Sequence, residues 1–137
     1  MKKYLAITSL LVTFYSHAEV SPIDTAQQQC LDKASTTLAM QQCFSAANKA
    51  WDSEMNQQYS KLTTTLNSDQ KAKLRTAQRA WLKYRDSWLD ATKARLSDSG
   101  TLASLELGAQ GVNLVKNQAL ALKSLAGGSC ANPDDCK

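Results

Sequence analysis

The 137-residue sequence is poor in three residue types, with one histidine (His17), five glycines and two prolines. Histidine is the usual general base of catalytic triads and a frequent metal ligand, so its scarcity argues against both kinds of site. Few glycines and prolines argue against a β-rich or disordered chain. A chain of this length has room for one ordinary hydrophobic core. We therefore predict no catalytic residue, no cofactor and no metal site, and we do not expect an enzyme.

The N-terminal residues have the three-part pattern of a secretory signal peptide. Lys2 and Lys3 form a basic start, residues 4–15 are mostly apolar, and Ser16-His17-Ala18 puts small residues three and one before a cleavage position. The apolar stretch is too short to span a bilayer comfortably, although an N-terminal anchor or an apolar core helix is an alternative. We predict a signal peptide over residues 1–18 and export to the periplasm or the medium.

Removal of this leader changes the charge of the protein. The full chain has 16 Lys and Arg against 12 Asp and Glu, and without Lys2 and Lys3 it has 14 against 12, a net charge of +2. Such a nearly neutral domain, over residues 19–137, lacks the basic footprint of a nucleic-acid-binding protein. It also has no histidine and no apolar run long enough to cross a membrane. Neither a nucleic-acid partner nor a membrane span is predicted.

The cysteines are even in number and, after export, meet an oxidising compartment. Three pairings of Cys30, Cys43, Cys130 and Cys136 are possible, and the spacing favours the local pairs Cys30–Cys43 and Cys130–Cys136. A loop as long as the first should add about 3 kcal/mol to the stability by restricting the unfolded chain. Zinc held by all four cysteines is the alternative, but the short CxxC motifs of such sites are absent.

Apolar residues recur at helical spacing along most of the mature chain. The pattern predicts a short helix from residue 22 to about 33 and long helices over 38–66, 69–97 and about 102–126, followed by a Cys-containing tail over 127–137. Asn67 and Gln70 form a variant capping box, and Gly100 suits a left-handed C-terminal cap. The stretch over 38–66 has a clear apolar stripe, which comprises Met40, Cys43, Ala47, Trp51, Met55, Tyr59, Leu62 and Leu66.

The helices over 38–66 and 69–97 are equally long and are joined by a short turn, which predicts an antiparallel hairpin. When the two helices are paired antiparallel about this turn, Trp51 faces Tyr84, and Met55 falls beside Trp81. We therefore predict an aromatic–Met core between these two helices. The expected fold is all-α, a small helical bundle built on a long antiparallel helical hairpin and stapled by disulfides.

Acidic residues on the hairpin do not form a catalytic pair. Asp52 and Glu54 are two positions apart on a helix and therefore point about 200° apart. Asp52 and Asn56 flank the apolar stripe, and across the hairpin they could reach Arg79, Lys83 or Arg85. We interpret them as a polar pair that sets the register of the hairpin.

Three sequence motifs resemble those of a known family of small exported bacterial proteins. They are Cys30 with Thr36-Thr37-x-x-Met40-x-x-Cys43, then Trp51-Asp52-x-x-Met55-Asn56-x-x-Tyr59-x-x-Leu62, then Leu74-x-x-Ala77-Gln78-Arg79-Ala80-Trp81-Leu82-x-Tyr84-Arg85-Asp86. In order and spacing they resemble the LprI-type lysozyme-inhibitor family from about Cys30 to Thr101. The resemblance implies an extracytoplasmic helical domain, and the family is named after a member that inhibits lysozyme.

The sequence departs from the family pattern at two places. Members often carry a cysteine where this chain has Ser87-Trp88-Leu89, and a Gly-Gly-Thr where it has Ser99-Gly100-Thr101. The missing cysteine suggests that Cys130 and Cys136 pair with each other. The signature residues lie mostly on or beside the core stripes, so we expect most of them to hold the hairpin together; they are Trp51, Asp52, Met55, Asn56, Tyr59, Gln78, Arg79, Trp81, Tyr84, Arg85 and Asp86.

The resemblance predicts a function in protein binding. The leading hypothesis is an exported inhibitor of lysozyme or a related peptidoglycan-cleaving enzyme. The alternatives are a periplasmic immunity or envelope-stress protein against another toxin, and a structural envelope module without an enzyme target. A net charge of +2 gives no electrostatic steering toward strongly basic lysozymes, so inhibition would need an Arg or Lys that reaches the paired catalytic carboxylates.

Overall fold

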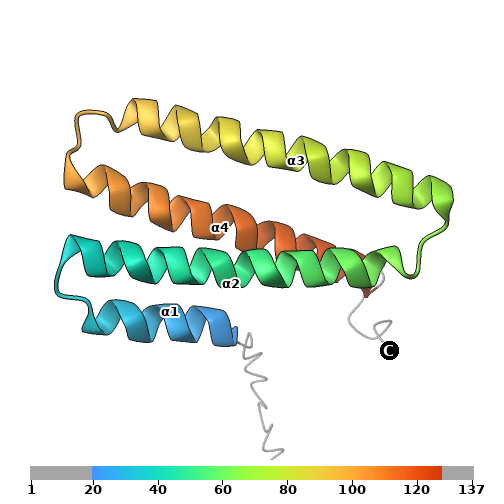
Figure 1. Ribbon diagram of the computed structural model, residues 1–137, viewed down its shortest axis with the longest axis horizontal. Coiled ribbons are helices and arrows are strands. Elements are labelled where there is room, and N and C mark those ends of the chain that lie inside the picture. The colour runs from blue at the N-terminus through green and yellow to red at the C-terminus, as the bar shows by residue number, and fades with distance from the viewer. Residues whose placement is uncertain (1–19, 128–137) are drawn as a thin grey trace, which may run out of the picture.

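The computed structural model describes residues 20–127, which form four α-helices and no strand. They are α1 (Pro22–Lys33), α2 (Thr37–Thr63), α3 (Ser68–Arg95) and α4 (Thr101–Ala126). The three long helices run antiparallel to their neighbours in the chain, and the short α1 lies along α2 (Figure 1). The predicted all-α bundle is confirmed. The predicted signal peptide and the Cys130–Cys136 pair lie outside the described residues.

Local sequence signals set the helix ends. The Thr36 hydroxyl accepts a hydrogen bond from the backbone N–H of Ala39 at 3.1 Å and so caps α2. Asn67 and Gln70 form the predicted capping box of α3, in which each side-chain oxygen accepts from the other residue's backbone N–H at 3.0 Å. Gly100 has φ +58°, which L side chains rarely adopt, and it turns the chain from α3 into α4.

The hydrophobic core lies between α2 and α4, which make by far the most extensive contact between helices. Two glycines of α4 allow this contact to be close. A Cβ atom on Gly108 would lie 3.0 Å from the Cβ of Phe44, and one on Gly111 would lie 3.1 Å from the side-chain nitrogen of Asn48. The buried core residues are Ala47, Trp51, Met55 and Leu62 from α2 and Val112, Val115, Ala119 and Leu122 from α4.

The predicted aromatic–Met core between the second and third helices is wrong in its partner helix. Trp51 and Met55 are buried, but they pack in the α2–α4 core, whereas Tyr84 and Trp88 are 53% and 48% exposed. No residue of α3 is buried. The reason is steric, because the small residues of α4 let its backbone approach α2 closely, whereas Trp81 is the aromatic residue of α3 that packs against this core.

Two contacts fasten α1 to the long helices. The predicted disulfide between Cys30 and Cys43 is formed and joins α1 to α2, with the Cys43 side chain buried. The Lys116 ammonium of α4 pairs with the Asp24 carboxylate of α1 at 2.6 Å. Within residues 20–127 no helix is both long enough and apolar enough to cross a membrane.

The core assignment predicts unequal effects for two leucine substitutions. Leu62→Ala, at a residue that is 2% exposed in the α2–α4 core, should lower the free energy of unfolding by about 2–5 kcal/mol because it leaves a cavity. Leu82→Ala, at a residue of α3 that is 36% exposed, should cost less than about 1 kcal/mol. Urea unfolding followed by far-UV circular dichroism measures both. Equal losses would contradict the placement of the core.

Candidate protein-binding face on α3

The buried family-signature residues all lie on α2, and those on α3 are half-buried or exposed. Trp51 and Met55 lie in the core, and Tyr59 packs against it. On α3, by contrast, Arg79 and Tyr84 are exposed. The structure therefore places the α2 signature residues where they hold helices together, and it leaves much of the α3 signature free to contact a partner.

Gln78 is the signature residue that ties α3 to both other long helices. Its side-chain amide nitrogen donates a hydrogen bond to the sulfur of Met55 on α2 at 3.5 Å. Its amide oxygen accepts one from the side chain of Gln118 on α4 at 2.8 Å. These contacts, together with the half-buried Leu74 and Trp81, attach one side of α3 to the core. Gln78 therefore has a structural role.

The remaining α3 signature residues, together with Trp88, form a cluster with aromatic and basic character, in which Tyr84, Asp86 and Trp88 are exposed and Trp81 and Arg85 are half-buried. The Arg85 guanidinium lies 5.4 Å from the ring centroid of Trp81 and pairs with the Asp86 carboxylate at 2.8 Å. Tyr84 stacks on Trp88 with ring centroids 6.0 Å apart, and we call these two residues the aromatic pair. Trp, Tyr and Arg are the residue types most often found at the energetic centres of protein interfaces. Motif reading could not reveal that this cluster is exposed.

The predicted polar contacts across the α2–α3 hairpin are not formed among residues 20–127. Asp52 accepts a hydrogen bond from Asn56 at 3.2 Å within α2. Glu54, on another side of that helix, accepts one from Gln58 at 2.8 Å. The reason is that α3 contacts chiefly α4, so its basic residues do not lie against the Asp52 side of α2. The two carboxylates remain separate, as the helical spacing predicts.

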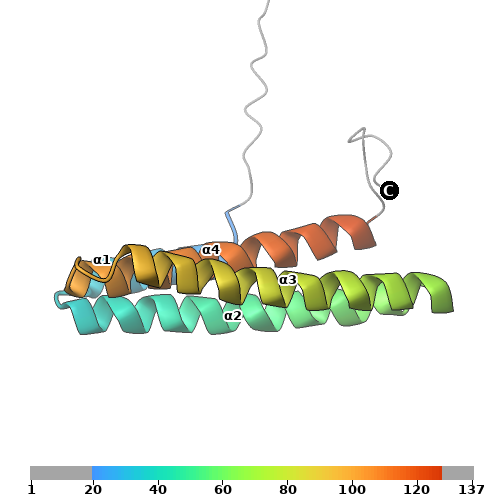
Figure 2. The ribbon, with the colours of Figure 1, turned by 90° about the horizontal axis from the view of Figure 1, so that it is seen from above.

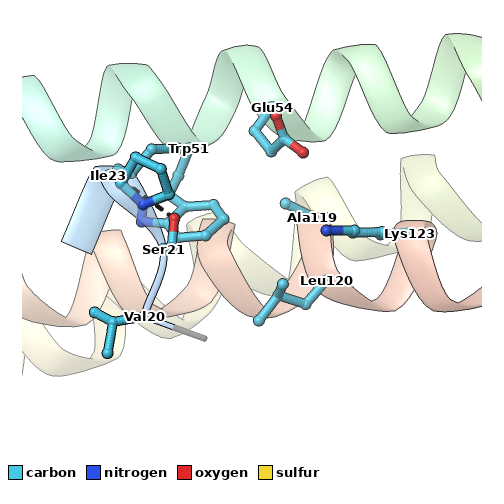
Figure 3. Close-up of a pocket in the computed structure, with 9 residues that line it drawn as sticks. Val20, Ser21, Ile23, Trp51, Glu54, Ala119, Leu120 and Lys123 are labelled. Atoms are coloured by element: carbon cyan, nitrogen blue, oxygen red, sulfur yellow. Dashed lines mark hydrogen bonds between the residues drawn. The ribbon is translucent and has the colours of Figure 1, made fainter. Parts of the chain in front are cut away.

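A hollow of about 460 Å³ lies where the described chain begins, between α1, α2 and α4 (Figure 3). Trp51 lines it, and the indole N–H of Trp51 is buried with no hydrogen-bond partner among the described residues. Glu54 and Lys123 are the charged residues around the hollow. They provide no nucleophile with an adjacent base, and the described residues contain no cluster of His, Cys, Asp or Glu able to hold a metal ion. The exposed face of α3 is therefore the stronger candidate site.

These features define a small disulfide-linked helical domain with exposed aromatic and basic residues on α3. The sequence model of one protein family, described as lysozyme inhibitor LprI, matches residues 30–122, from the end of α1 to near the end of α4. The chain therefore belongs to the LprI lysozyme inhibitor family, as the motifs predict. The match extends beyond Thr101, where the motif resemblance fades, so α4 is part of the family domain.

One solved structure, an uncharacterised protein from Burkholderia thailandensis, is similar to this chain. The two share 29% sequence identity and superpose with a TM-score of 0.70, over 78% of this chain and 54% of that protein. The chain thus matches about half the length of this relative. A search of curated proteins finds no match.

The bridging role of Gln78 leads to a prediction about the rate of amide hydrogen exchange in α3. Because α3 buries no residue, its backbone amides should exchange with deuterium faster than those of α2 and α4. Gln78→Ala removes both interhelical hydrogen bonds and should accelerate exchange in α3 by about tenfold or more, because each bond contributes about 0.5–1.5 kcal/mol. Gln57→Ala is the matched control, since Gln57 bonds only to Ser53 on its own helix. Mass spectrometry measures the exchange rates of the α3 amides in both variants. Equal rates in the two variants would contradict the bridging role of Gln78.

Proposed function

We propose that the protein inhibits a lysozyme or a related peptidoglycan-cleaving enzyme by binding to it, and that it has no catalytic activity of its own. The observation that carries this proposal is the family match over residues 30–122. It includes the whole of α3, on which Arg79, Tyr84 and Trp88 are exposed. Exposed aromatic and basic side chains on a helix held by a packed core suit a docking surface.

The proposed place of action is the periplasm or the medium. The Cys30–Cys43 disulfide supports it, because such bonds persist in oxidising compartments and are rare in the cytosol. The signal-peptide pattern over residues 1–18 supports it independently at the level of sequence. Peptidoglycan-cleaving enzymes act in the same compartments, so an inhibitor exported there meets its target.

A turbidity assay tests the proposed function directly. The full-length mature protein, added in molar excess to lysozyme and peptidoglycan-rich cells, should slow the clearing of the suspension. The assay should use a panel of lysozyme-class enzymes, some with basic and some with acidic surfaces, because the family description does not say which lysozyme is inhibited. Unchanged clearing with every enzyme of the panel would contradict the proposal.

The aromatic pair should contribute strongly to inhibition. Trp88→Ala should raise the concentration for half-inhibition about 30-fold, which corresponds to the roughly 2 kcal/mol of an interface hot spot. Leu102→Ala is the matched control, because Leu102 is also apolar and is 63% exposed, but it begins α4. Equal effects of the two substitutions on inhibition would show that the aromatic pair has no special role. Circular dichroism should show that both variants keep their helix content.

A further inference from the structure

The positive charge of the described chain is concentrated on α3. Residues 68–95 contain eight Lys and Arg against three Asp, whereas the other residues between 20 and 127 contain five Lys against six Asp and Glu. The concentration is strongest over residues 70–85, which contain six Lys and Arg and no acidic residue. The small net charge of the whole chain therefore conceals one strongly basic helix.

The structure exposes basic residues and the aromatic pair on different sides of α3. Arg75, Arg79 and Lys83 are exposed and recur every four residues, so they form one row along the helix, which we call the basic row. Successive residues of a helix point about 100° apart, so the aromatic pair, which starts at Tyr84, lies on a different side from Lys83. Over residues 76–87 the exposed residues between the two are small; they are Thr76, Ala80 and Ser87. Nearer the start of α3, on the same side, the exposed Lys73 and Asp69 pair with each other at 2.8 Å.

This arrangement limits the shape and the charge of a partner. A flat lipid surface would touch one side of the helix only, and it would leave either the basic row or the aromatic pair in water. A second copy of the chain, docked through the same helix, would bring like charges together. A concave surface that carries carboxylates can contact both sides of a helix about 10 Å wide.

We infer that α3 binds in the substrate groove of the target enzyme, with Arg79 and Lys83 of the basic row facing its paired catalytic carboxylates. The inference rests on the proposed function and names the face and the partner chemistry. Glycan-cleaving enzymes bind their substrate in an elongated cleft with two carboxylates on either side of the scissile bond. Over residues 76–87 the small residues between the row and the aromatic pair let this part of the helix approach the floor of such a groove closely.

Charge reversal on two helices separates this inference from a general effect of charge. Arg79→Glu/Lys83→Glu and the control Lys49→Glu/Lys61→Glu change the net charge equally, and all four positions are exposed, the control pair on α2. The α3 variant should raise the concentration for half-inhibition at least about 30-fold, and the control should change it less than about threefold. Arg79→Gln/Lys83→Gln, which introduces no new repulsion, should give an intermediate loss. Circular dichroism checks the fold of each variant.

Competition with ligand in the groove provides the second readout. A soluble N-acetylglucosamine oligomer, which occupies the groove of a lysozyme-class enzyme, should displace the wild-type protein in a binding assay, and rising salt should weaken the complex. Inhibition that survives both the oligomer and the α3 reversal would overturn the inference and leave the proposed function intact. If the wild-type protein inhibits no enzyme, the proposed function fails and the inference fails with it. Binding to anionic phosphatidylglycerol vesicles, lost in the α3 variant without any enzyme binding, would overturn the inference in favour of a lipid partner.

Discussion

The close approach of α2 and α4 is the constraint on which the rest of the structure depends. Gly108 and Gly111 remove the side chains that would otherwise meet Phe44 and Asn48, and the two helices interlock along their length. In an isolated helix these glycines are unfavourable by up to about 1 kcal/mol each, and here that loss is offset by burial of the core. The Cys30–Cys43 disulfide and the Lys116–Asp24 ion pair then fix α1 against this pair of helices.

Because α4 occupies the apolar face of α2, α3 is left at the edge of the bundle. Figure 2, which shows the bundle from above, illustrates how α3 lies along the other two long helices without being enclosed by them. A helix in that position can carry eight basic residues, since seven of them are exposed and the half-buried Arg85 pairs with Asp86. The same position explains how Tyr84 and Trp88 remain exposed in a domain with only a small core. Exposure and charge on α3 thus have one structural cause.

Much of the fold could be predicted from the sequence, because the signals concerned are local. Helix periodicity, the Asn67–Gln70 capping box and the short Cys30–Cys43 separation each involve residues close in the chain. The pairing of the helices could not be predicted in the same way. The apolar stripe of α2, which includes Trp51 and Met55, can pack against either α3 or α4, and the short turn to α3 suggested the wrong one. Periodicity shows which side of a helix is buried but does not identify the helix that covers it.

For the candidate site, too, some features follow from the sequence and others only from the tertiary structure. The sequence by itself determined the helices, the disulfide, the family motifs and the excess of basic residues over positions 70–85. Only the tertiary structure decided that Met55 and Gln78 connect helices while Arg79, Tyr84 and Trp88 face outward. The physical reason is that exposure depends on which helices approach most closely, and that is set by side-chain volumes summed over residues far apart in the chain.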